Sequence, residues 1–260
     1  MRNFKTANLC AVALAASTLL TPTQDAAAEG WDWTVAPYLW AIAPELDFYA
    51  NGNEILSGDL DFNDILDNLE FAALVHAEGR KDSLGFFGDV QYMKLSDNIE
   101  VNGGLIIPDG TSVRTNTQLT VIEIGGFYRP SAAEHGFDIL AGARITISDI
   151  DLDITFPQLG TSQVGGSETM TDGFAGMRYS APIAEKWFMV VRGDVGAGDS
   201  EIAWNGLLTF GRNFGKANNK SFLFGYRYLY MEFDGTSDGG VDTEADLTIA
   251  GPHVGVAFAF

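Results

Sequence analysis

The sequence predicts an all-β fold, an antiparallel β-barrel that crosses a membrane with its strands. Three observations support this prediction: apolar and polar residues alternate over most of the chain, short and long connections follow one another in turn, and aromatic residues gather at segment ends. A period of two places successive side chains on opposite faces of a strand. Short turns at one end and long loops at the other are typical of transmembrane barrels.

The alternation separates an apolar face from a face with ionisable groups. In residues 70–80, EFAALVHAEGR, Phe71 and Val75 share one face and Glu78 lies on the other. LGFFGDVQY and FDILAGARITI repeat this pattern. We expect ten strands, and 8 or 12 remain possible because the segments 44–68 and 149–171 could each add or lose a hairpin. The expected strands cover residues 31–43, 69–80, 84–96, 116–129, 136–148, 172–182, 186–196, 201–214, 221–233 and 246–260.

The connections between these strands alternate in length, with long loops expected at 44–68, 97–115, 149–171 and 234–245. Aromatic residues at both ends of the strands predict the two girdles that membrane interfaces favour. A soluble barrel has no reason for two such rings. The girdle at the short turns comprises Trp31, Trp33, Tyr128, Trp187, Phe214, Phe222 and Phe260, and the girdle at the long loops comprises Trp40, Tyr92, Trp204 and Tyr230.

The N-terminal region has the pattern of a secretory signal peptide over residues 1–28. Arg2 and Lys5 precede an apolar run, and Ala26 to Ala28 supply a small-residue cleavage site. We therefore expect one barrel domain over residues 29–260. This domain contains 13 Lys and Arg residues and 34 Asp and Glu residues. The excess of negative charge argues against nucleic acid as a partner.

The last strand, HVGVAFAF, places apolar residues at every second position and ends in phenylalanine. Val254, Val256, Phe258 and Phe260 resemble the targeting strand of bacterial outer-membrane barrels, which implies recognition by the barrel-assembly machinery. Together with GDVGAGDSEIAW and GYRYLYMEFDG, it resembles a family of small porin-like outer-membrane proteins of Gram-negative bacteria. The resemblance implies a location in the cell outer membrane, with outer-membrane lipid and lipopolysaccharide as surroundings, and it implies no substrate.

The polar face of the strands predicts a charged lumen. A salt-bridged core would hold the barrel in one shape, since unpaired charges in a confined lumen are costly. The alternative is a narrow diffusion channel for small polar solutes, although a barrel of about eight strands is just filled by side chains. The expected network comprises Glu78, Asp89, Glu123, Arg144, Arg178, Arg192, Asp194 and Arg227.

An outer-membrane hydrolase is a third reading, which histidine placement disfavours. His135 falls in a predicted turn, and His76 and His253 lie in mid-strand on the inward face, away from the rim or lipid face where such enzymes place histidine. We expect no enzyme activity and no cofactor.

The expected long loops are acidic, and 44–68, 149–171 and 234–245 contain neither Lys nor Arg. Asp149, Asp151 and Asp153 form a weak candidate for a divalent metal, but the simpler expectation is that Ca²⁺ or Mg²⁺ bridges the acidic loops to lipopolysaccharide without a dedicated site. FNDILDNL, residues 62–69, is the one stretch with helical spacing and predicts a short helix at the barrel mouth.

Overall fold

The computed structural model describes residues 30–50, 52–59, 69–101, 111–131, 133–156, 160–215, 218–236 and 242–260. The expected signal peptide lies outside these residues. So does the expected helix at 62–69, apart from its last residue, where a strand begins. No helix in the described ranges is long and apolar enough to cross a membrane.

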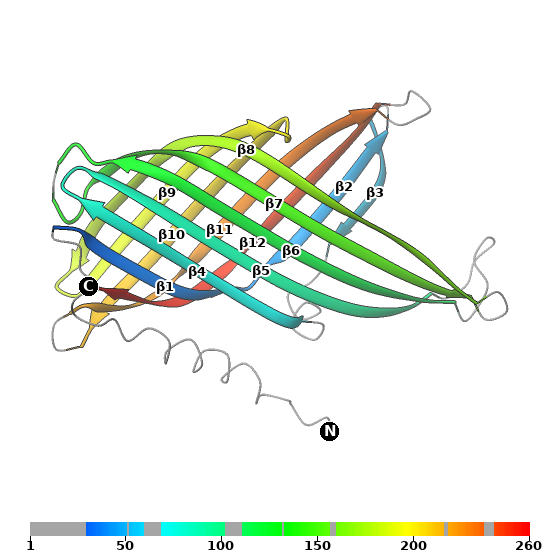
Figure 1. Ribbon diagram of the computed structural model, residues 1–260, viewed down its shortest axis with the longest axis horizontal. Coiled ribbons are helices and arrows are strands. Elements are labelled where there is room, and N and C mark those ends of the chain that lie inside the picture. The colour runs from blue at the N-terminus through cyan, green and yellow to red at the C-terminus, as the bar shows by residue number, and fades with distance from the viewer. Residues whose placement is uncertain are drawn as a thin grey trace, which may run out of the picture.

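The described chain is built from strands joined in one sheet (Figure 1). Every strand pairing in the described residues is antiparallel, as hairpin connections between successive strands require. The strands are β1 (Asp32–Trp40), β2 (Ala43–Ala50), β3 (Asn53–Asp59), β4 (Leu69–Lys81), β5 (Leu84–Val101), β6 (Thr111–Tyr128), β7 (Phe137–Phe156), β8 (Gly160–Ala184), β9 (Trp187–Gly198), β10 (Ile202–Phe214), β11 (Lys220–Thr236) and β12 (Asp242–Ala259).

The sheet closes into a barrel of ten strands, β1 and β4 to β12, because β1 pairs with both β4 and β12. This closure confirms the predicted fold and strand number. The end of the chain completes the seam: the Trp33 amide donates to the Phe260 carbonyl at 2.9 Å, and the Phe260 amide donates back at 3.0 Å. Closure leaves no open edge along the shared height of the strands, the condition for spanning a lipid bilayer with strands.

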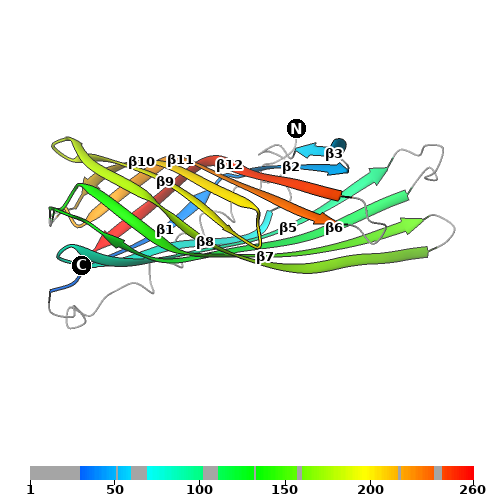
Figure 2. The ribbon, with the colours of Figure 1, turned by 90° about the horizontal axis from the view of Figure 1, so that it is seen from above.

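The two ends of the barrel differ in their connections. The short connections between Lys81 and Leu84, Tyr128 and Phe137, Ala184 and Trp187, and Phe214 and Lys220 lie at one end together with Phe260, on the left in Figure 1. We call this the short-turn end and the opposite one the long-hairpin end. At the long-hairpin end the strands continue in two branches, one from β5 to β8 and one from β11, β12, β2 and β3 (Figure 2).

The prediction that these segments are long loops is wrong, because much of their length forms paired strands. β7 and β8 keep register up to Phe156 opposite Gly160, and β5 and β6 up to Val101 opposite Thr111. β2 and β3 occupy part of 44–68. The sequence pattern did not indicate these extensions, because residues 160–171 lack alternation and the polar positions of 149–154 are acidic, whereas backbone pairing needs no apolar face.

The outward face of the barrel carries large exposed apolar side chains, as a lipid-facing wall requires. The prediction is wrong for one girdle residue, Trp40. This side chain is buried and points into the lumen, where its Nε1 donates to the Gly251 carbonyl at 3.1 Å. Trp40 lies on the same face of β1 as the buried Ala36, and the exposed Leu39 lies on the other face. The exposed set includes Val75, Phe86, Val90, Ile124, Ile139, Met177, Val195, Trp204, Tyr226 and Val254.

Candidate functional site: a closed lumen

The middle of the lumen is filled by charged side chains from strands on several sides. Strand alternation turns Glu123 on β6, Arg144 on β7 and Arg192 on β9 inward, and all three are buried. The register sets Glu123 directly opposite Arg144. Because the barrel is closed, side chains from non-neighbouring strands meet across its axis.

Glu123 is the centre of this network. Its Oε1 accepts hydrogen bonds from Arg144 Nε at 3.0 Å and Arg227 Nη2 at 2.6 Å, and its Oε2 lies 3.0 Å from Arg192 Nη1. Three guanidinium groups therefore surround one carboxylate. The contact between Arg192 Nη1 and Glu123 Oε2 is an ion pair rather than a hydrogen bond, because Oε2 has no partner of hydrogen-bond geometry among the described residues.

Asp194 balances this excess of positive charge. Its Oδ1 accepts from Arg144 Nη2 at 2.8 Å, and its Oδ2 accepts from Arg192 Nε at 2.8 Å. Asn205 joins the two halves of the network, since it donates to Asp194 Oδ2 at 2.8 Å and accepts from Arg227 Nε at 2.9 Å. A buried charge is tolerable only when paired and hydrogen-bonded in this way.

A second group of charges lies nearer the short-turn end. Arg178 donates from Nη2 to Glu78 Oε1 at 3.1 Å and from Nε to Asp138 Oδ2 at 2.8 Å. Arg129 holds the same aspartate with two donors, Nε at 2.6 Å and Nη2 at 2.9 Å, and also donates to the Ala133 carbonyl at 3.1 Å. This bidentate pairing fixes a turn to the wall of the barrel.

His76 and Asp89 link the two groups of charges. His76 Nδ1 lies 3.1 Å from Asp89 Oδ2, and its Nε2 lies 3.7 Å from Glu78 Oε2. Asp89 Oδ1 accepts from the Tyr38 hydroxyl at 2.7 Å and lies 3.9 Å from Arg227 Nη1. The charged contacts thus run without a break from the Arg129 turn to the middle of the lumen.

Phenylalanine rings and glycines give the charged layer its shape. A Cβ on Gly142 would lie 2.8 Å from the Phe174 ring, and one on Gly125 would lie 2.7 Å from the Phe87 ring. The rings therefore lie flat across neighbouring strands, where only glycine leaves room. Arg192 sits over both rings, 5.1 Å from the centroid of Phe87 and 5.3 Å from that of Phe174. Such cation–π contacts hold the guanidinium groups in place.

An apolar layer closes the lumen between the charged layer and the long-hairpin end. The layer lies on the inward faces of six strands, and Ala203, Leu229 and Met231 are fully buried within it. Arg227 connects the two layers, since its guanidinium lies 5.2 Å from the Trp40 ring centroid. The core of this apolar layer comprises Trp40, Ile42, Leu74, Met93, Ala203, Leu229, Met231 and Ile249.

A polar cavity of about 700 Å³ occupies the lumen at the short-turn end. Glu78, His76 and Arg178 are among its lining residues, so the second group of charges forms part of its wall. Thr34 and Phe260 line it as well. The lumen therefore has three zones in order: an open polar cavity, a charged layer and an apolar layer.

The structure brings all eight residues of the expected charge network into these contacts. Asp138, Arg129 and Asn205 also belong to these contacts, although the sequence pattern did not indicate them, and the apolar layer was not expected either. Asp138 shares the inward parity of Arg144, so the signal for it was present in the alternation. Arg129 reads as a turn residue, and only the fold returns its side chain to the lumen.

The histidines of the lumen lie among buried polar groups of the strands. The partner of His76 is Asp89, and His253 Nε2 lies 3.0 Å from the Thr209 hydroxyl, with both of these groups buried. The expected positions of His76 and His253 on inward faces agree with this placement. His135 lies near the Phe188 ring, at 5.9 Å between ring centroids, beside the cavity at the short-turn end.

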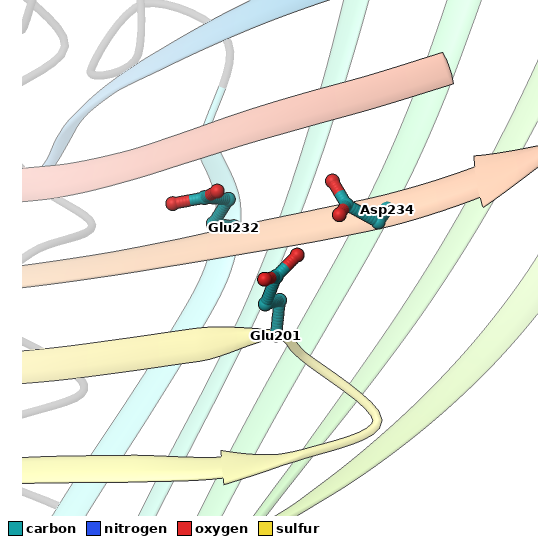
Figure 3. A group of neighbouring side chains, drawn as sticks. All are labelled: Glu201, Glu232 and Asp234. Carbon is teal, nitrogen blue, oxygen red and sulfur yellow. The ribbon is translucent and has the colours of Figure 1, made fainter. Parts of the chain in front are cut away.

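Acidic groups converge at the long-hairpin end. Glu201, Glu232 and Asp234 bring carboxylate oxygens within 4.8 Å of one another, between the β9–β10 turn and β11 (Figure 3). The hydrogen bond and the charge of Asp234 raise the pKa of the exposed Glu201 carboxyl above its ordinary value. The expected metal candidate Asp149, Asp151 and Asp153 lies elsewhere, on β7, where Asp153 accepts from Gln163 Nε2 at 2.8 Å.

The closed antiparallel sheet and its apolar outer wall define a β-barrel of the bacterial outer-membrane type. No protein-family model matches the chain, and no curated protein does. Several similar solved structures are barrels of this type, at low identity. The outer membrane protease OmpT from Escherichia coli has a TM-score of 0.48 and 10% identity, over 89% of this chain and 97% of that one.

Two further solved structures are also similar. Neisserial surface protein A has a TM-score of 0.31 and 15% identity, over 89% of this chain and 100% of that one. Ail, the attachment invasion locus protein of Yersinia pestis, has a TM-score of 0.35 and 9% identity, over 89% of this chain and 99% of that one. These similarities concern the fold.

Proposed function

We propose that the chain is an integral protein of the outer membrane of a Gram-negative bacterium, with a closed lumen and a structural or surface-interaction role. The single observation that carries this proposal is the double closure of the lumen. A solute moving along the axis would have to break the ion pairs around Glu123 and then pass the layer of Trp40 and Met231. Both steps are costly in a narrow barrel.

The two ends of the barrel support an orientation in the membrane. Short turns of outer-membrane barrels face the periplasm and long connections face outward. The acidic branches at the long-hairpin end would then meet lipopolysaccharide, with Ca²⁺ or Mg²⁺ bridging the two anionic surfaces. Lipid would contact the apolar wall, and the strand ending in Phe260 would be the segment read by the barrel-assembly machinery.

A narrow diffusion channel is the second candidate, and the cavity at the short-turn end favours it. That cavity already opens part of the lumen to polar solutes. It stops at Arg178 and Glu78, so conduction would need the charged and apolar layers to rearrange. Catalysis is the least supported reading, because the groups around His76 are carboxylates rather than a nucleophile, and the Thr209 hydroxyl beside His253 is buried.

Planar-bilayer recording on the purified protein tests the proposal. We expect little or no steady conductance, since paired charges and packed apolar side chains leave no continuous column of water. A large open-channel current from the unmodified protein would instead establish the channel function. Cell fractionation checks the location: we expect recovery with the outer membrane and heat-modifiable gel mobility, and recovery in the soluble periplasm would contradict the proposal.

A further inference from the structure

The outer part of the β7–β8 hairpin has a free edge that is longer than those left on β3, β5 and β11 in the described residues. β8 pairs with β7 along its whole outer length, up to Gly160 opposite Phe156. Its pairing with β9 starts only at Asp172, opposite Gly198. In the part of the chain that the structure describes, residues 160–171 thus have a strand on one side and no strand on the other. Figure 1 shows β7 and β8 running together to the tip of their branch.

The free edge begins at a fixed point. The Thr171 amide donates to Asp199 Oδ2 at 2.7 Å, and the Asp199 amide donates to the Thr171 carbonyl at 3.1 Å. The β9–β10 turn thereby satisfies the backbone groups of Thr171, the last residue of the edge, and the unpaired groups lie in residues 160–170. Ser200 anchors the same turn, since its amide donates to Asp172 Oδ1 at 2.9 Å.

The sequence of the edge has none of the features that usually keep an edge strand from pairing. GTSQVGGSETMT contains no Lys, Arg or Pro, and Glu168 is its one charged residue. Its register with β7 continues without a bulge. Edge strands of natural proteins are normally short, bulged, or protected by Lys and Pro, because their unpaired N–H and C=O groups recruit another strand.

The strand beside the edge supplies negative charge. Asp149 lies opposite Ser167 in the register, and Asp151 lies opposite Gly165, so small residues separate these carboxylates from the edge. Their neighbours on the far side, Gln118 and Asn116, are uncharged. A strand added to β8 would lie about 10 Å from β7, two strand spacings away. Long basic side chains on that strand can extend across Gly165 and Ser167 toward the aspartates.

We propose that residues 160–171 of β8 form a docking edge for an extended basic polypeptide segment, which adds to the sheet as a further strand. Its Lys or Arg residues, at every second position, face Asp149 and Asp151. Backbone hydrogen bonds supply the affinity of strand addition, and alternate side chains supply its specificity. This inference rests on the proposed surface-interaction role. A second copy of the chain is a poorer occupant, because it would bring its own Asp149 and Asp151 beside these carboxylates.

The test uses the full barrel in lipid nanodiscs and a fluorescent peptide of alternating Lys and Thr. We expect saturable binding by fluorescence anisotropy, with slower hydrogen exchange confined to amides of residues 160–171. The same peptide with every second backbone nitrogen methylated keeps its charge but cannot pair as a strand, and it should lose binding. Equal binding of both peptides would overturn strand addition.

Two matched variants separate this edge from general acidity. The double substitution Asp149→Asn and Asp151→Asn should weaken peptide binding by about tenfold, as expected for the loss of two exposed ion pairs. Glu244→Gln with Asp246→Asn removes the same charge from β12 and should leave binding unchanged. Equal losses in both variants would show attraction to the acidic end as a whole and would refute the proposal.

Two further outcomes would show that something other than a basic peptide binds this edge. The chain after residue 28 has no cysteine, so Ser162→Cys gives a single site for cross-linking. A disulfide-linked dimer of this variant, formed in nanodiscs without peptide, would show that a second copy covers the edge. Displacement of the peptide by lipopolysaccharide with Mg²⁺ at physiological ionic strength would assign the edge to that surface. Bilayer conductance is independent of all these results, so the closed lumen and the docking edge can fail separately.

Discussion

Carboxylates occur in two regions of this barrel and are treated in opposite ways. In the lumen Glu123 is fully buried, and arginines meet both of its oxygens. At the long-hairpin end Glu201 and Asp234 are exposed and lie beside each other. The difference follows from solvent: water screens like charges at the end, whereas a confined lumen makes each unpaired charge expensive.

This difference indicates that the charges of the lumen stabilise the barrel more than those at the long-hairpin end. Five arginines and five carboxylates contact one another in the lumen, and phenylalanine rings hold the guanidinium groups. Acid groups at the long-hairpin end contribute surface charge instead. Substitutions of the same chemical type should therefore have large effects inside and small effects outside.

The largest effect is expected for Arg227→Gln, which leaves Glu123 and Asp89 without one of their cationic partners. Breaking one side of a buried pair typically costs about 3–5 kcal/mol. Arg192→Gln should act in the same direction, since it takes a partner from Glu123 and Asp194. Unfolding in urea, followed by heat-modifiable gel mobility, measures the loss.

Arg80→Gln is the matched control for that substitution. Arg80 pairs with Asp32 at 3.2 Å, but the Asp32 side chain is 80% exposed. An exposed pair is worth about 1 kcal/mol or less. Equal losses for Arg80→Gln and Arg227→Gln would show that burial does not distinguish the two regions.

Met231→Ala should have the next largest effect, because it opens a cavity in the apolar layer. Met231 is fully buried, and truncation of a buried methionine to alanine costs about 2–5 kcal/mol. The same unfolding measurement applies. A loss well below this range would mean that the apolar layer is loosely packed and closes the lumen poorly.

Gly142→Ala should destabilise by about 1–3 kcal/mol, the usual cost of overpacking. The added Cβ would lie 2.2 Å from the Ile124 carbonyl oxygen, so backbone has to move. Gly193→Ala is its control on the outward face, where a Cβ meets nothing within 4 Å. Equal stability of the two variants would show that the inward glycines do not shape the charged layer.

Sequence patterns predicted much of this lumen because strand parity is a local property. Alternation placed Glu123, Arg144 and Arg227 inward and indicated ten strands. It could not place Trp40 correctly, because aromatic residues occur both in girdles and in cores. The outer extension of β7 and β8 was expected to be a loop because the polar positions of 149–154 are acidic and residues 160–171 lack alternation. Which arginine meets which carboxylate depends on closure of the sheet.

The smallest effect is expected at the long-hairpin end. Asp234 raises the pKa of Glu201 in the folded protein, so folding is favoured while Glu201 is protonated and this contribution is lost as pH rises through the ordinary and then the raised pKa. Glu201→Gln should therefore unfold at a slightly higher temperature at neutral pH and unchanged at strongly acidic pH. A gain that persists in acid would point to a cause other than charge.

Chemical labelling of single cysteines tests the central claim, that the lumen is open at the short-turn end and closed beyond it. Thr34 lines the cavity and Ala203 is fully buried in the apolar layer. With a cationic thiol reagent applied to the folded barrel, we expect rapid modification of Thr34→Cys and protection of Ala203→Cys, with both reacting after denaturation. Rapid labelling of Ala203→Cys in the folded protein would show that water reaches the apolar layer and would contradict the closed lumen.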